Sequence, residues 1–187
     1  MSNYFSYFPK VDYDIDKSGT THNVVNILRR FVVHAKVKDR TAVYYDYLIQ
    51  EGDRPDTIAG KYYDDPKLDW VVLMVNEIFD PNFDWPLHYT GFKNFIIDKY
   101  TTVALAHSTT HELRRITRAE STNSLGDFLP EISVVVDQET FDALTSAEQK
   151  TVTKYDYEFD LNESKRSIRV LDKNHLTKIL DEASKIF

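Results

Sequence analysis

Three aspartate–proline pairs divide the middle of this chain and restrict how it can fold. Each places an aspartate one or two residues before a proline: Asp53 with Pro55, Asp65 with Pro66 and Asp80 with Pro81. An aspartate can accept hydrogen bonds from the unpaired amides at a helix start, and proline is tolerated in a helix's first turn but not in its interior. The pattern therefore predicts one helix after Asp53 and a second after Asp65, which ends before Pro81.

The neighbouring segments complete a strand–helix–helix–strand unit. Residues 43–49 are β-branched and aromatic, and Gly52 ends them as a predicted strand. After the second helix, residues 84–87 are expected to form a closing extended segment. Four side chains of the two helices are expected to form the core, and burial of each stabilises the unit by about 1.5–3 kcal/mol: Ile58, Tyr62, Trp70 and Leu73.

Two extensions flank this unit. In residues 1–42, apolar residues follow helical spacing from Asn23 onward and predict a helical arm: Val24, Ile27, Leu28 and Phe31. In residues 91–187, residues 101–130 lose periodicity and predict loops, whereas residues 132–136 predict a short strand.

The C-terminal part of the chain carries a second clear pattern. Residues 155–161 alternate between large apolar and acidic side chains, which predicts a strand with one apolar and one charged face. Residues 168–170 supply its partner in a β-hairpin, and Asn174 begins a final helix. The sequence thus predicts an α+β fold: an N-terminal helical arm (1–42), a central βααβ module (43–90), and a C-terminal extension with the β-hairpin and helix (91–187).

Composition excludes several classes of function. The formal net charge is −7, from 23 basic and 30 acidic residues, and no basic face is clustered enough to bind nucleic acid. No apolar run approaches the ~20 residues of a membrane span, and the start of the chain carries no pattern of a secretory signal. The absence of cysteine removes disulfides and thiolate sites. We expect no cofactor and no enzymatic activity, because no catalytic constellation is present.

Two groups of residues have the spacing of metal ligands but lack parts of the motif. Asp12, Asp14 and Asp16 resemble the start of a calcium loop, yet its sixth and twelfth positions hold Lys17 and Asn23 instead of glycine and glutamate. His107 and His111 have zinc spacing, but Ser108 follows the first histidine where the zinc-protease motif needs glutamate. We therefore expect a solvated acidic arm and surface histidines, with no metal.

The central segment resembles known modules. The residues that resemble the LysM module are Gly52-Asp53, Ile58-Ala59, Tyr62-Tyr63, Trp70, Asn76, Ile78 and Pro81. The longer string from Gly52 to Leu87 is similar to a phage family, the LysM-like baseplate wedge protein of contractile-tailed bacteriophages. Residues 7–13 and 26–30 resemble the N-terminal segments of that family, and residues 157–168 its C-terminal hairpin.

The resemblance implies a non-enzymatic structural subunit of the tail baseplate wedge. Members of such a family join wedge components and neighbouring wedges, so the implied partners are other wedge proteins and sheath-proximal baseplate subunits, in several copies per baseplate. The implied location is the virion, after assembly in the host cytoplasm. LysM modules also bind polymers of N-acetylglucosamine, so peptidoglycan binding is the alternative. We do not favour it, because a single module gains nothing from repetition.

Five residues are candidate partner contacts. Aromatic and arginine side chains are common interface anchors, and the candidates are Arg29, Arg30, Phe79, Phe83 and Trp85. The alternative for Arg29 and Arg30 is a solvated helix face, and the alternative for Trp85 is burial against the module.

Overall fold

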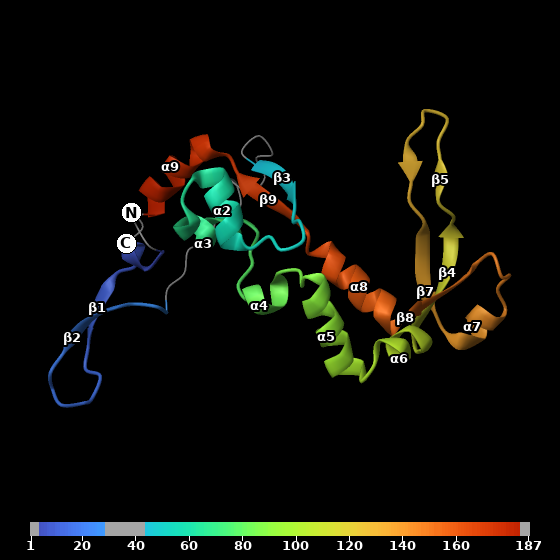
Figure 1. Cartoon of the computed structure of the whole chain (residues 1–187), viewed down its shortest axis with the longest axis horizontal. Helices are drawn as coiled ribbons and strands as arrows, with labels where there is room; N and C mark the ends of the chain where they lie inside the picture. The colour runs from blue at the N-terminus through green and yellow to red at the C-terminus, as the bar shows by residue number, and fades with distance from the viewer. Residues whose placement is uncertain (1–3, 29–43, 184–187) are drawn as a thin grey trace. The chain divides into compact units, whose positions relative to one another are not determined.

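A computed structural model describes residues 4–28 and 44–183 of the chain (Figure 1). The chain forms two compact units. The first unit consists of Met1–Pro86 and Lys165–Phe187, and the second of Leu87–Ser164. Both units combine helices and strands, so the expected α+β class is confirmed. None of the described helices is both long and apolar enough to cross a membrane.

The first unit is built on two strands that are far apart in the sequence. Strand β3 (Tyr44–Leu48) pairs antiparallel with β9 (Ser167–Leu171), so that Tyr44 lies opposite Leu171 and Leu48 opposite Ser167. After β3 the first unit continues with α2 (Pro55–Tyr63), η3 (Pro66–Leu68), α3 (Asp69–Val75) and α4 (Pro81–Asp84), and β9 follows after the second unit. Helices α2 and α3 pack on each other, and α3 packs on β9. The strand and both helices predicted from the sequence are therefore present.

The predicted C-terminal hairpin is wrong, and residues 84–87, expected to be extended, do not close the unit. Residues 84–87 form no strand; the strand beside β3 is β9, which joins the unit only after the whole second unit. The other half of the predicted hairpin is a helix, α8 (Lys154–Ser164), so β9 has no neighbour there. The predicted terminal helix is confirmed as α9 (Lys173–Ala183).

The alternation in residues 155–161 led to the wrong prediction of a strand, because two polar residues lie on the buried face of α8. Glu158 and Asn162 lie one helical turn apart and are only 4% and 6% exposed. Tyr155 and Phe159 have the same spacing, and their rings stack at a centroid distance of 6.2 Å. Because Glu158 and Asn162 occupy part of the buried face, only Tyr155 and Phe159 remain as an apolar pair at helical spacing, and the period-two alternation is the stronger pattern in the sequence.

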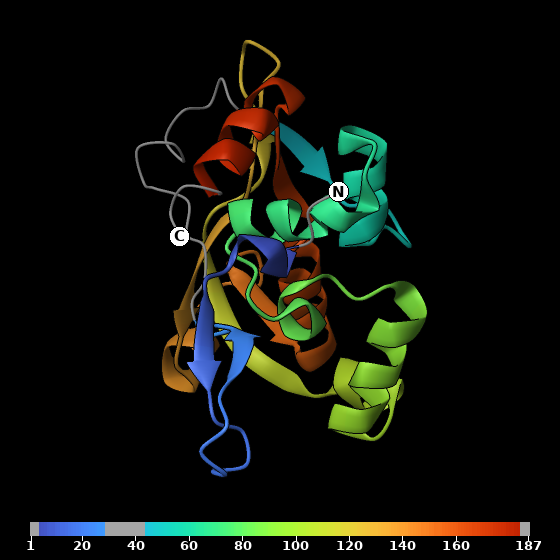
Figure 2. The same ribbon diagram turned by 90° about the vertical axis from the view of Figure 1, so that its left-hand side faces the viewer.

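The N-terminal arm is also different from the prediction. After a short 3-10 helix, η1 (Tyr4–Tyr7), strands β1 (Lys10–Tyr13) and β2 (His22–Val25) form an antiparallel hairpin, visible in blue in Figure 2. The predicted helix from Asn23 is thus wrong as far as residue 28. The strand is favoured because Val24 and Val25 are β-branched and have Lys10 and Val11 as partners across the hairpin.

The second unit combines three helices with a three-stranded sheet. Helices α5 (Tyr89–Tyr100), α6 (Val103–Ser108) and α8 enclose a small core of Phe92, Ile96 and Ala106. The sheet has the order β7-β4-β8. Its parts and the neighbouring elements are β4 (Thr110–Arg118), β5 (Ser121–Thr122), β6 (Phe128–Leu129), β7 (Ile132–Val136), α7 (Gln138–Asp142) and β8 (Gln149–Thr153).

Residues 101–130 are therefore not the loop that the sequence predicted. They hold α6 and the nine-residue strand β4. Strand β4 carries charged side chains at its centre, such as Arg114 and Arg115, because these pair with Glu112 and Glu148. The short strand predicted at residues 132–136 is confirmed as β7.

Candidate partner-contact surface

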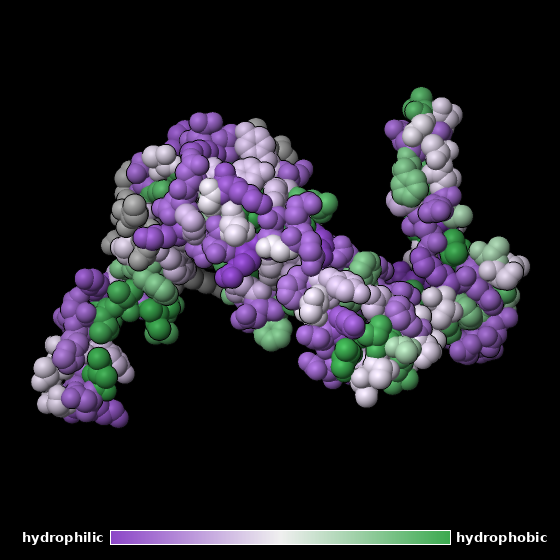
Figure 3. Space-filling view, viewed as in Figure 1, coloured by the Kyte–Doolittle hydropathy of each residue, from purple (hydrophilic) through white to green (hydrophobic). Residues whose placement is uncertain are grey.

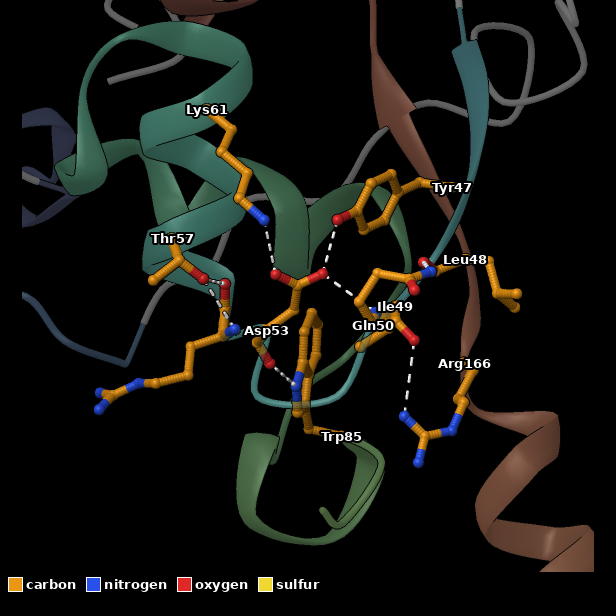
Figure 4. A network of polar contacts seen from close by, with 10 residues as sticks. Tyr47, Leu48, Ile49, Gln50, Asp53, Thr57, Lys61, Trp85 and Arg166 are labelled. Carbon is orange, nitrogen blue, oxygen red and sulfur yellow. Dashed lines mark hydrogen bonds and ion pairs between the residues drawn. The ribbon is translucent and has the colours of Figure 1, made fainter. Parts of the chain in front are cut away.

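The candidate surface lies at one edge of the first unit, where the turn before α2 meets the loop after α3. Asp53 is the centre of this edge (Figure 4). Its carboxylate accepts hydrogen bonds from the Tyr47 hydroxyl at 2.6 Å, from the Gln50 amide at 3.0 Å and from Lys61 Nζ at 2.7 Å. The turn is closed by Gly52, whose φ of 85° is left-handed and suits glycine.

Asp53 does not cap helix α2, contrary to the sequence prediction. Arg54 occupies the N-cap position, and its backbone N–H donates to Thr57 Oγ1 at 2.9 Å. The other two aspartates do act as caps: Asp65 accepts from the Lys67 amide and Asp80 from the Asn82 amide, each at 3.0 Å. Asp53 instead ties strand β3 to helix α2 through its three side-chain bonds.

The electrostatics of the turn depend on these bonds. Burial alone would raise the pKa of Asp53, but the hydrogen bonds from Lys61, Tyr47 and Gln50 outweigh it and lower the pKa of this carboxyl below its ordinary value. The same pairing raises the pKa of Lys61. Asp53 therefore contributes to stability as a carboxylate.

Trp85 fixes the loop after α3 to this turn. Its side chain is 9% exposed, and its indole Nε1–H donates to the Asp53 carbonyl oxygen at 3.1 Å. The same loop is held from the other side by Lys165, whose Nζ donates to the Phe83 carbonyl at 2.6 Å. Trp85 is buried in the unit itself, and its contacts support the loop from inside.

Two other candidates are presented to solvent by this loop. Phe79 is 62% exposed and Phe83 is 75% exposed. Phe79 also borders an apolar hollow of about 310 Å³, together with Tyr4, Trp70, Leu73, Met74, Ile78 and Pro81. Helix α4, which contains Phe83 and begins just after Phe79, is anchored by its Asp80 cap at one end and by buried Trp85 at the other. The loop therefore holds two exposed aromatic rings on a fixed backbone.

The remaining predicted residues lie as follows. Arg29 and Arg30 lie outside the described residues. Ile58 is fully buried and Trp70 is 6% exposed, while Leu73 packs on the core from its border. Tyr62 is 38% exposed and meets the Tyr47 ring edge-on, and its neighbour Tyr63 is the tyrosine that is buried.

Sequence reasoning missed the role of Asn76. Its Oδ1 accepts from the Arg169 amide, and its Nδ2 donates to the carbonyls of Arg169 and Val72, all at 2.8 Å. The side chain thus pairs with the side of β9 that faces away from β3, as a further strand would. The presence of Asn76 beside Ile78 in the LysM-like motif marked it as a residue of interest, but its partner Arg169 is 93 residues away in the sequence.

The two groups with metal-ligand spacing have other contacts. Asp14 accepts from the amides of Ser18 and Gly19 and so shapes the turn between β1 and β2. The His107 ring stacks on that of Tyr155 with a centroid distance of 3.9 Å, and the His111 ring stacks on that of Tyr157 with a centroid distance of 3.8 Å. Within the described residues, no group of three or more histidine and carboxylate side chains could hold a metal ion.

Comparison with known proteins gives two matches. The family model described as "Base plate wedge protein 53" matches residues 3–117. The baseplate wedge protein gp53 of Enterobacteria phage T4 is 28% identical over 102 residues, which cover 53% of this chain and 52% of that protein. The chain thus matches about half the length of this curated relative. Because the family model spans more than half of the chain, including the whole candidate surface, the chain belongs to the phage base plate wedge protein 53 family.

Proposed function

We propose that this protein is a structural subunit of a phage tail baseplate wedge, which joins wedge proteins and neighbouring wedges during baseplate assembly. The observation that carries the proposal is the family match over residues 3–117. The proposed partners are other wedge proteins and sheath-proximal baseplate subunits, in several copies per baseplate. The proposed site of assembly is the host cytoplasm, and the protein then remains in the virion without enzymatic activity.

The scaffold for this role is a LysM-like module whose closing strand comes from the end of the chain. This proposal is supported by the order of β3, α2 and α3 in the sequence and by the antiparallel pairing of β3 with β9. In the sequence, the second unit is inserted between helix α4 and strand β9. An insertion at this place lets one small, well-packed module carry a second contact-bearing unit.

Phe79 and Phe83 are the proposed anchors for a wedge partner. Both rings are exposed, and their loop is held by Trp85 and by the Asp80 cap, so partner binding would order few side chains. Trp85 then acts as a support for the loop and not as a direct contact. Arg29 and Arg30 remain proposed contacts for a wedge partner.

The test measures binding of the full chain to purified wedge proteins from the same phage. Replacing Phe79 and Phe83 together by alanine should weaken binding by at least about 30-fold, the effect of about 2 kcal/mol at an interface centre. The matched control is Tyr89→Ala, since Tyr89 is 71% exposed but lies in the second unit. Unchanged affinity and normal assembly with the double variant would refute the contact assignment.

The alternative, sugar binding, predicts a different outcome with the same variants. The same two phenylalanines could stack on sugar rings of peptidoglycan. If the protein is retained on peptidoglycan, is released by N-acetylglucosamine oligomers and fails to bind wedge proteins, the structural proposal is wrong.

A further inference from the structure

Among the residues that the structure describes, strand β7 is an edge strand of the sheet in the second unit, with no further strand paired to its outer side. The sheet order is β7-β4-β8. Its five residues, Ile-Ser-Val-Val-Val, contain no charge and no proline. Ile132 is 46% exposed, Val134 47% and Val135 60%, so apolar side chains project on both faces of the strand. Figure 3 shows the projecting hairpin that contains β4 and β7 as a mixture of purple, white and green atoms, with green, hydrophobic atoms at its tip and near its base.

The opposite edge of the same sheet is different. Strand β8 carries Lys150 among its five residues, and helices α6 and α8 pack against it. Soluble proteins commonly block sheet edges with lysine, proline or a covering helix, because a free edge pairs with other strands. One edge of this sheet thus has two of these protections, and β7 has neither a charge nor a proline.

A free edge determines the kind of group that covers it. Its alternating N–H and C=O groups require another extended strand, and its exposed β-branched side chains require apolar neighbours across that strand. A second β7 meets both requirements. Antiparallel pairing centred on Val134 places Val134 opposite its own copy, Ile132 opposite Val136, and Ser133 opposite Val135. No pair within the five-residue strand contains a charge; just beyond its ends Glu131 lies opposite Asp137, and there Glu131 is paired with Lys150 at 2.7 Å and Asp137 caps α7.

The charged side chains of β4, the strand next to β7, do not oppose such pairing. Arg114 and Arg115 of β4 lie opposite Val135 and Val134, but their charges are compensated by Glu112 at 2.6 Å and Glu148 at 3.0 Å. Two copies would therefore approach without strong like-charge repulsion between their central strands.

We propose that β7 is an isologous contact, through which two copies of this chain join their three-stranded sheets into one six-stranded sheet. The contact has two-fold symmetry and closes on itself, so it yields dimers and no filament. A five-residue strand pair buries less than the roughly 1,200 Å² of a standard interface, and the association is weak in dilute solution. Its place of action rests on the proposed function, because copies held within one assembly reach effective concentrations on the order of 1 mM.

Sedimentation of the full chain between about 10 μM and about 1 mM tests the proposal. The average mass should rise from one chain toward two and not beyond. Val134→Lys places two lysines opposite each other at the symmetry centre and should abolish the rise. The matched control is Thr151→Lys, at an exposed position of β8, which should leave the rise in mass unchanged.

A mixture of variants separates pairing from a failure to fold. Val134→Glu alone should remain monomeric, but an equimolar mixture with Val134→Lys should form dimers again, because opposite charges then face each other. A wild-type chain that stays monomeric at about 1 mM, one that forms larger species, or a mixture that stays monomeric would overturn the proposal. None of these results affects the wedge proposal, which is tested by Phe79 and Phe83 in the other unit.

Discussion

Replacing Asn76 by alanine tests whether one side chain holds strand β9, which follows the second unit in the sequence, in the first unit. The amide makes three hydrogen bonds of 2.8 Å, two to Arg169 and one to Val72. Each net bond contributes about 0.5–1.5 kcal/mol, and water can reach the exposed backbone at Arg169 once the side chain is removed. We therefore expect the free energy of unfolding of the first unit to fall by about 2 kcal/mol.

Urea unfolding followed by tryptophan fluorescence measures this loss in the correct unit. The chain has two tryptophans, Trp70 and Trp85, and both belong to the first unit. With a slope of about 1–3 kcal/mol/M, the midpoint should fall by about 1 M. The control is Asn82→Ala, an exposed asparagine of α4 at which a change should remain within about 0.5 kcal/mol. Equal midpoints for Asn76→Ala and Asn82→Ala would refute the role assigned to Asn76.

Three further predictions concern the other polar contacts. Trp85→Phe removes the indole donor to Asp53 but keeps most of the ring, so the first unit should lose about 1 kcal/mol in the same assay, and no loss would contradict the anchoring role. Because the pKa of Asp53 is lowered on folding, its stabilisation is present above the unfolded value of about 3.9 and is lost as the pH falls through the folded pKa. Urea midpoints between neutral and acid pH should therefore fall less steeply in Asp53→Asn than in the wild type. Asn162 bonds to both backbone groups of Leu87, at 2.7 and 3.1 Å, so Asn162→Ala should speed hydrogen exchange at the Leu87 amide without changing tryptophan fluorescence.

The elements that the sequence predicted well are those with local signals. Asp65 and Asp80 cap the elements that follow them, because a cap is decided by a few neighbouring residues. Strand β7 was also found from its β-branched residues. The exposed Phe79 and Phe83 could be named as candidates because they lie beside a proline-bounded loop, which is a local feature as well.

The failures share a different cause. Asp53 has the sequence of a cap, but Tyr47 and Lys61 compete for its carboxylate from another strand and helix. Residues 155–161 alternate like a strand, but they form a helix in which buried Glu158 accepts hydrogen bonds from Lys99 and Tyr100, each at 2.7 Å. The partners of Glu158 lie 59 and 58 residues away, and those of Asp53, although only 6 and 8 residues away, belong to other elements, so neither set can be read from a local cap or alternation pattern.

The sequence alone therefore determined the α+β class and the strand–helix–helix part of the first unit, because these follow from short-range caps, prolines and apolar spacing, and it determined the family through the resemblance of its residues to known members. Only the tertiary structure decided which strand closes that unit and where the second unit is inserted. Strand β9 is chosen by its register with β3 and by the Asn76 amide, and both are contacts between segments more than 90 residues apart. Hydrogen bonds of that kind depend on where the chain folds back, and local composition does not record it.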